Sequence, residues 1–213
     1  MTKQTITNKI KELTFVEPRL FLDEKTIIVG SSNSLLSAEH GKYIDDFNDV
    51  IRFNRAPIDR LYNHIGEKCT LRVVNNHVFD NIDAEKDGYT KQPQYFIKNL
   101  ANQRILYIAE DLSPWNRREQ NTHKDSKLFK FDYNNIDKLF DNGDNMRLCI
   151  GTIITMLCVE ANIKPVIIGF DVDTDERSHY WENRPGAGDC HKVVYDNEIL
   201  INLEKENKIV IIR

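Results

Sequence analysis

Short apolar runs rich in β-branched residues recur along the chain, and each of them predicts a β-strand. The first run, 26–30, reads Thr-Ile-Ile-Val-Gly and is followed by a polar turn at 31–34 and then by Leu35 and Leu36, which indicate a helix start. Six further runs share this apolar character: 49–53, 71–74, 104–109, 127–131, 165–169 and 209–212. Stretches compatible with helices separate several runs, and this alternation predicts an α/β layered fold with a largely parallel sheet.

Two helices stand out between the predicted strands. Residues 151–162 are apolar on almost every side, so we expect this helix to pack between the sheet and other helices. Residues 195–206 predict a second helix, because Ile199, Leu200 and Leu203 recur at helical spacing.

The length of 213 residues predicts one domain, 1–213, that can bury a sizeable core. Residues 1–24 form an N-terminal extension in this interpretation. Residues 111–127 include Pro114, Trp115 and a run of charges, which indicates a long loop or lid.

Composition narrows the class of protein further. Hydrophobic residues make up 40%, charged residues 29% and the formal net charge is -4, so nothing in the charge favours nucleic-acid binding. The first thirty residues lack a long apolar run, and we therefore expect neither a signal peptide nor a membrane span, and cytoplasmic residence. The four cysteines lack short paired spacing, which favours reduced thiols over a zinc site or disulfide framework. Cys190, beside a histidine, is either a nucleophile or an incidental thiol, and we favour the thiol.

Two histidines are the strongest candidates for chemistry. His179 is followed by Tyr180, Trp181 and Glu182, and His191 follows a Gly/Pro-rich link. Imidazoles beside aromatic and carboxylate groups suit proton transfer near neutral pH, which makes an enzyme the first hypothesis.

Three other segments have both a functional and an ordinary interpretation. The turn at 30–34 and the strand end at 52–54 could hold a nucleotide at the carboxyl edge of a parallel sheet, or they could be plain turns. The helix start at Gly151 and Thr152 suits a phosphate, but a simple helix end explains it too. Asp171 and Asp173 resemble a metal-binding D-x-D pair, although acidic residues follow at once and favour a solvated loop.

Taken together, these segments resemble the sialylmotifs of glycosyltransferase family 29, the eukaryotic-type sialyltransferases. Residues 27–74 resemble the large motif. The matching segments are long and specific: Val29-Gly30, Gly41, Ile44-Asp45, Asp49-Val50-Ile51-Arg52-Phe53-Asn54-Arg55-Ala56-Pro57 and Ile65-Gly66-Glu67-Lys68-Cys69-Thr70. The small motif is resembled by 151–171, the third motif by His179-Tyr180-Trp181-Glu182, and the very small motif by His191 with Asp196. Order and spacing agree over most of the chain.

The resemblance implies a GT-A-like variant fold, with one Rossmann-like domain and a mostly parallel central sheet flanked by helices. It implies inverting transfer of sialic acid from CMP-sialic acid to a hydroxyl of an acceptor oligosaccharide or glycolipid, with no metal or other cofactor and no nucleic acid. Peripheral membrane association stays an open alternative. His191 would be the general base, His179 would bind the CMP phosphate, and Asp196 and Glu182 would support them. The implied donor-binding residues are Gly30, Ser31, Asn33, Ser34, Asn54, Gly151, Thr152 and Tyr180.

The chain also departs from the family pattern. Ser31 stands where the family usually has Asn, Ile150 lies where it has Thr, and Asp196 replaces Glu. The cysteine pair that usually links the large and small motifs is missing. With no stem or anchor in the sequence, the chain looks like a minimal bacterial or viral member. Three alternatives therefore remain: a transferase that uses CMP-Kdo, a metal-dependent transferase that uses Asp171 and Asp173, and a CMP-binding module without catalysis.

Overall fold

Seven parallel strands form one sheet within the residues that the computed structural model describes, namely 22–54, 56–58, 61–75, 104–109, 128–132, 148–173, 179–180 and 193–213. The strands are β1 (Thr26–Val29), β2 (Asp49–Phe53), β3 (Leu71–Asn75), β4 (Arg104–Ala109), β5 (Leu128–Asp132), β6 (Val166–Ile168) and β7 (Val210–Ile212). All seven runs that the sequence predicts are strands, shifted by at most a few residues at their ends. The parallel α/β fold class is therefore confirmed.

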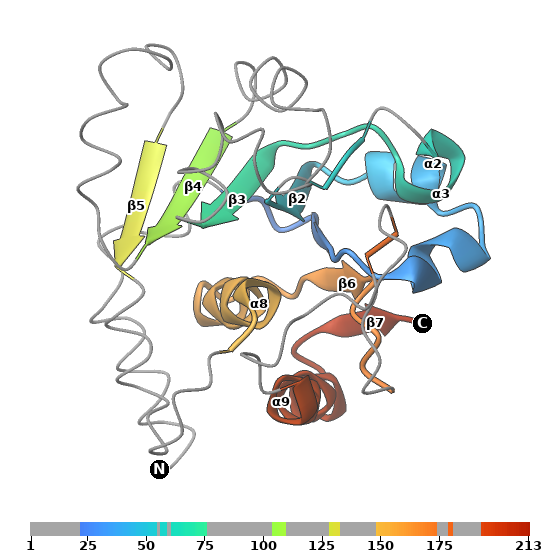
Figure 1. Ribbon diagram of the computed structural model, residues 1–213. Coiled ribbons are helices and arrows are strands. Elements are labelled where there is room, and N and C mark those ends of the chain that lie inside the picture. The colour runs from blue at the N-terminus through green and yellow to red at the C-terminus, as the bar shows by residue number, and fades with distance from the viewer. Residues whose placement is uncertain are drawn as a thin grey trace, which may run out of the picture.

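The strand order is β5-β4-β3-β2-β1-β6-β7. The chain builds β1 to β5 outward in one direction and then returns to place β6 on the free side of β1, as Figure 1 shows. The pairing of β1 with β6 is in parallel register, with Ile27 opposite Val166 and Val29 opposite Ile168. The direction of strand addition therefore reverses between β1 and β6.

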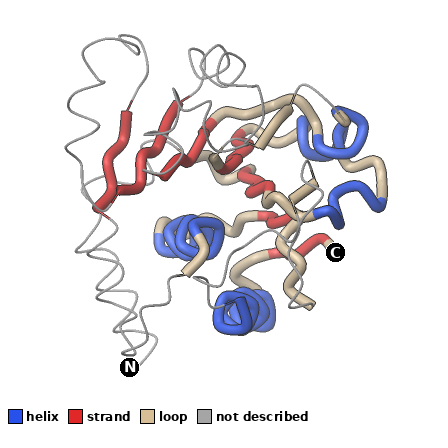
Figure 2. The backbone as a smooth tube through the Cα atoms, in the orientation of Figure 1, coloured by secondary structure: helices blue, strands red, loops and turns tan. Residues whose placement is uncertain are grey.

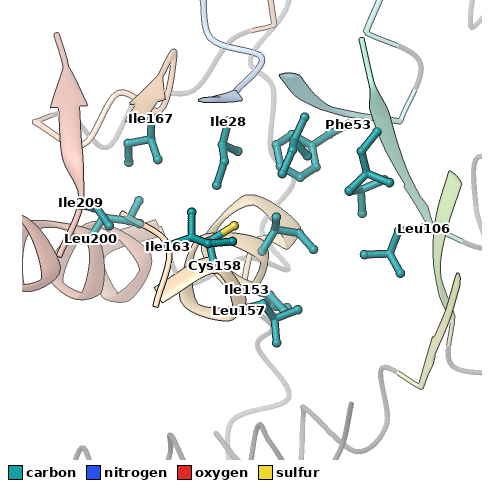
Figure 3. Close-up of a cluster of buried hydrophobic side chains, with 14 of the residues drawn as sticks. Ile28, Phe53, Leu106, Ile153, Leu157, Cys158, Ile163, Ile167, Leu200 and Ile209 are labelled. Atoms are coloured by element: carbon teal, nitrogen blue, oxygen red, sulfur yellow. The ribbon is translucent and has the colours of Figure 1, made fainter. Parts of the chain in front are cut away.

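Two long helices cover one face of the sheet. They are α8 (Ile150–Glu160) and α9 (Val193–Lys205), and both follow the predicted spans within two residues (Figures 1 and 2). Ile28, Phe53 and Leu106 of the sheet pack in one buried cluster with α8 side chains such as Leu157 (Figure 3). Within a strand, every second residue faces this cluster, because successive side chains of a strand point to opposite faces of the sheet.

The opposite face is covered by three short elements whose bounds the sequence did not indicate. They are a 3-10 helix η2 (Asn33–Ser37), α2 (Gly41–Asp45) and α3 (Tyr62–Ile65). Leu35, Ile44 and Ile65 from these elements pack with Ile27 and Val29 in a second buried cluster. Four- and five-residue helices are too short to show a helical period, so only Leu35 and Leu36 had hinted at one of them.

Buried polar groups tie the connections between strands to the sheet. The guanidinium of Arg52 is completely buried and donates to the carbonyl oxygens of Ile65 (2.5 Å) and Lys68 (2.9 Å). Loss of solvation lowers the pKa of this group from its ordinary value. Arg52 therefore holds the segment between α3 and β3 against β2.

Cys69, Cys149 and Cys158 form no disulfide bond with one another, whereas Cys190 lies outside the described residues. Burial raises the pKa of the Cys158 thiol to about 12, so this cysteine is a protonated core residue. None of the helices in the described part of the chain is long and apolar enough to cross a membrane. The predicted loop 111–127 and residues 1–21 of the predicted extension lie outside the described residues.

The close approach of the turns after β1 and β6 yields a stability prediction. A Cβ atom at Gly30 would lie 2.0 Å from the carbonyl oxygen of Gly169, a backbone atom that cannot rotate away. We expect Gly30→Ala to lower the free energy of unfolding by about 2 kcal/mol or more, measured by urea denaturation. The neighbouring Ser31→Ala is the control and should change it by less than about 0.5 kcal/mol. Equal stability of the two variants would contradict this close approach.

Candidate active site

The candidate site lies at the carboxyl ends of β1 and β6, where the order of strand addition reverses. In open parallel sheets, ligands bind in the crevice at such a switch point. The two turns are joined by backbone hydrogen bonds, from Gly30 N to the Ile168 oxygen (2.8 Å) and from Ser32 N to the Gly169 oxygen (3.2 Å). Gly30 and the polar turn thus occupy the position that the sequence predicted for donor binding.

A hydroxyl network organises the turn after β1. Ser32 is buried, and its Oγ donates to the carboxylate of Asp171 while it accepts the backbone N–H of Ser34 (3.0 Å). This second bond makes Ser32 the N-cap of η2. Asn33 and Ser34, both predicted to bind the donor, are exposed and form the first turn of η2.

His179 is brought to the same turn although it is about 150 residues away in the sequence. It forms an antiparallel bridge with Ser32, and the adjacent backbone N–H of Tyr180 donates to the Ser31 oxygen (2.9 Å). The His179 side chain is half-exposed. The structure therefore places one of the two predicted catalytic histidines beside the predicted donor-binding turn.

Tyr180 joins this arrangement to the end of β2. Its side chain is buried, and its hydroxyl donates to the Pro57 oxygen (2.5 Å). This bond makes Tyr180 a support for the site, and its predicted contact with the donor stays a prediction. The prediction that placed it among the donor-binding residues had no signal for this bond, because Pro57 is 123 positions away.

Asn54 directly follows β2 and has a left-handed backbone, φ 45°. Its N–H donates to the Val73 oxygen (2.7 Å). Nη1 of the buried Arg72 donates to the Ala56 oxygen (3.0 Å) and to the Asn54 oxygen (3.4 Å). The segment after β2 is thus held by Arg72 and Tyr180, neither of which the sequence had singled out as its support.

The start of α8 reaches the same edge of the sheet through Phe170. A Cβ atom at Gly151 would lie 2.5 Å from the ring of Phe170, the second residue after β6, and that ring also contacts Phe53 edge to face. Gly151 and Thr152 are buried here. The positive end of the helix dipole is therefore close to the switch point.

Asp196 belongs to the first turn of α9 and is completely buried, and its carboxylate contacts the start of α8. Both oxygens of its carboxylate accept from the backbone N–H of Cys149, at 3.0 and 3.2 Å. A carboxylate is stabilised by the N-terminal end of a helix. Asp196, in the first turn of α9, therefore anchors α9 to the beginning of α8.

The remaining candidates are only partly described. His191 and Glu182 lie outside the described residues, as does Trp181. Asp171 contacts Ser32, whereas Asp173 pairs with Arg213 (2.8 Å), so the two carboxylates of the D-x-D pair have different partners. Within the described residues there is no group of three or more His, Cys, Asp or Glu side chains that could hold a metal ion.

Fold and site together define an α/β protein of the parallel type, with its candidate site at a switch point. The sequence model of glycosyltransferase family 29 (sialyltransferase) matches residues 24–208, and the chain belongs to this family. The resemblance in the sialylmotifs is thereby confirmed.

Curated relatives agree with this assignment. The mouse CMP-N-acetylneuraminate-beta-galactosamide-alpha-2,3-sialyltransferase 1 is 24% identical over 195 residues, which is 87% of this chain and 56% of that protein. The mouse beta-galactoside alpha-2,6-sialyltransferase 1 is 39% identical over 54 residues, 25% of this chain and 13% of that protein. The chain thus spans about half the length, or less, of the curated relatives it matches.

Solved structures show the same fold. A mammalian sialyltransferase in complex with Gal-beta-1-3GalNAc-ortho-nitrophenol aligns with a TM-score of 0.66 at 17% identity, covering 98% of this chain and 78% of that one. The apo alpha-2,3-sialyltransferase from Campylobacter jejuni aligns with a TM-score of 0.50 at 20% identity, covering 88% and 74%.

The bond between Tyr180 and Pro57 is testable through stability. Tyr180→Phe removes only the hydroxyl and leaves the Pro57 oxygen without this donor, so we expect a loss of about 1–3 kcal/mol in the free energy of unfolding. Tyr62→Phe is a matched control, because Tyr62 is 57% exposed, and should change it by less than about 0.5 kcal/mol. A Tyr180→Phe protein as stable as the control would show that the bond contributes nothing.

Proposed function

We propose that this protein transfers sialic acid from CMP-sialic acid to a hydroxyl of an acceptor glycan, with inversion and without a metal ion. The observation that carries the proposal is the pairing of His179 with Ser32 at the switch point, in a chain of the sialyltransferase family. The name of a mouse relative, CMP-N-acetylneuraminate-beta-galactosamide-alpha-2,3-sialyltransferase 1, supports CMP-linked sialic acid as the donor.

In this proposal the donor phosphate lies beside His179. A protonated or hydrogen-bonding imidazole would stabilise the negative charge that grows on the CMP phosphate as the glycosidic bond breaks. Backbone N–H groups at Gly151 and Thr152, together with the helix dipole, favour the same anion. Ser31, Asn33, Ser34 and Asn54 would contact the rest of the nucleotide.

His191 is proposed as the general base that removes the proton of the acceptor hydroxyl as it attacks. It precedes α9 by two positions, and the first turn of α9 is anchored to the start of α8 by Asp196. Because that anchor is independent of His191, a change at His191 should leave the donor side of the site intact. Glu182 is proposed to support the two histidines.

We expect substitutions of the two histidines to have different effects on transfer and on CMP binding. His191→Ala should lower kcat by about a hundredfold to ten-thousandfold while CMP still binds, because only the base is lost. His179→Ala should weaken CMP binding as well as transfer. Transfer is measured by mass spectrometry of the acceptor product and binding by calorimetry, with His40→Ala as the control.

Three results would overturn parts of the proposal. Full activity of His191→Ala would remove its assignment as base. Loss of wild-type transfer in chelator, restored by Mg²⁺ or Mn²⁺, would favour the metal-dependent alternative. Faster turnover of CMP-Kdo than of CMP-sialic acid would change the donor, and CMP binding with neither transfer nor donor hydrolysis would indicate a binding module.

A further inference from the structure

Asp171 places a carboxylate at the switch point. It is the third residue after β6, its side chain is half-exposed, and its Oδ2 accepts the hydroxyl of Ser32. Ser32 in turn is bridged to His179. The carboxylate of Asp171 and the backbone of His179 are thus both held by one serine in the candidate site.

The backbone of Asp171 is strained, with φ 43°. Non-glycine residues rarely adopt this conformation, and such residues concentrate at binding and catalytic sites. Asn54, at the end of β2, has the same left-handed backbone, φ 45°. Two polar residues at one edge of the sheet therefore share a conformation that regular strand endings do not require.

The contact with Ser32 uses only part of the carboxylate. A carboxylate can accept about four hydrogen bonds over its two oxygens. Ser32 bonds to Oδ2, and no residue in the described part of the chain bonds to Oδ1. Ser32 thereby orients the group and leaves an oxygen for a ligand with hydroxyl donors.

The negative charge of Asp171 determines which groups of a nucleotide its carboxylate can bind. A carboxylate repels a phosphate, but it forms strong charge-assisted hydrogen bonds with hydroxyl groups. The two vicinal hydroxyls of a ribose are such donors. Because the ribose is directly linked to the phosphate, its binding beside a phosphate at His179 fits the adjacency of Asp171, Ser32 and His179.

We infer that Asp171 accepts a hydrogen bond from the ribose 2′-hydroxyl of the donor nucleotide, so that the protein selects ribonucleotides over 2′-deoxyribonucleotides. This inference rests on the proposed function in that it takes a CMP-linked sugar as the ligand. It assigns Asp171 a role in binding, in place of the metal ligation weighed from the sequence.

The test compares CMP with 2′-deoxy-CMP by calorimetry on the full chain. Asp171→Gly and Asp171→Asn are suitable variants, because Gly and Asn tolerate a positive φ and so should preserve the backbone. Asp173→Asn is the matched control on the same loop, where Asp173 faces Arg213. Stability of each variant is checked by urea unfolding.

We expect the wild-type protein to bind CMP about tenfold or more tighter than 2′-deoxy-CMP, as one hydrogen bond to a charged group would give. Asp171→Gly should lose about tenfold in CMP affinity and change 2′-deoxy-CMP affinity less than twofold, so that the preference disappears. Asp171→Asn should lose part of the preference, and Asp173→Asn none.

Equal weakening of both nucleotides in Asp171→Gly would show that Asp171 only supports the turn, and would overturn the inference. An unchanged preference would overturn it as well. If the wild-type protein transfers sialic acid and the variants keep the preference for CMP over 2′-deoxy-CMP, the proposed function holds and this inference is wrong. A preference that depends on Asp171, with no transfer, would support the inference and overturn the transferase. No binding of either nucleotide by the wild-type protein would overturn both.

Discussion

The contact between the turns after β1 and β6 is the constraint on which the candidate site depends. Gly30 and Gly169 approach so closely that a Cβ atom at Gly30 has no room, and this contact lets the backbone of Ser32 bond to Gly169. Ser32 then contacts two distant segments: its hydroxyl donates to Asp171, and its backbone forms a bridge with His179. A parallel sheet that reverses its order at β1 is what creates a crevice there.

Most of the site is assembled by contacts with main-chain atoms. The guanidinium of Arg72, the hydroxyl of Tyr180 and the carboxylate of Asp196 all bond to backbone carbonyls or to a backbone N–H. Each of these side chains is buried, so each bond replaces one that the backbone group would make with water. They therefore fix where the strand ends and the start of α8 lie.

The strands and long helices could be predicted because their signals are local. The run Thr26–Val29 and the apolar stretch within 151–162 each carry a pattern that the folded chain keeps. The position of His179 beside the β1 turn could be inferred only by resemblance to a family, since a bridge to Ser32 leaves no trace in local periodicity. The bond from the Tyr180 hydroxyl to Pro57 and that from the Cys149 N–H to Asp196 were missed for the same reason. Asp171 was noticed, but the acidic residues that follow it favoured a solvated loop, and nothing in the local sequence indicated its contact with Ser32.

The bond from Tyr180 to Ser31 has a consequence for how this family can vary. The acceptor is the carbonyl oxygen of Ser31, an atom that every amino acid supplies at that position. A serine at residue 31, in place of the Asn of the family pattern, therefore changes the side chain of the turn and keeps the acceptor for Tyr180. The side chain at residue 31 can therefore differ between proteins while the backbone bond to Tyr180, next to His179, keeps the same geometry.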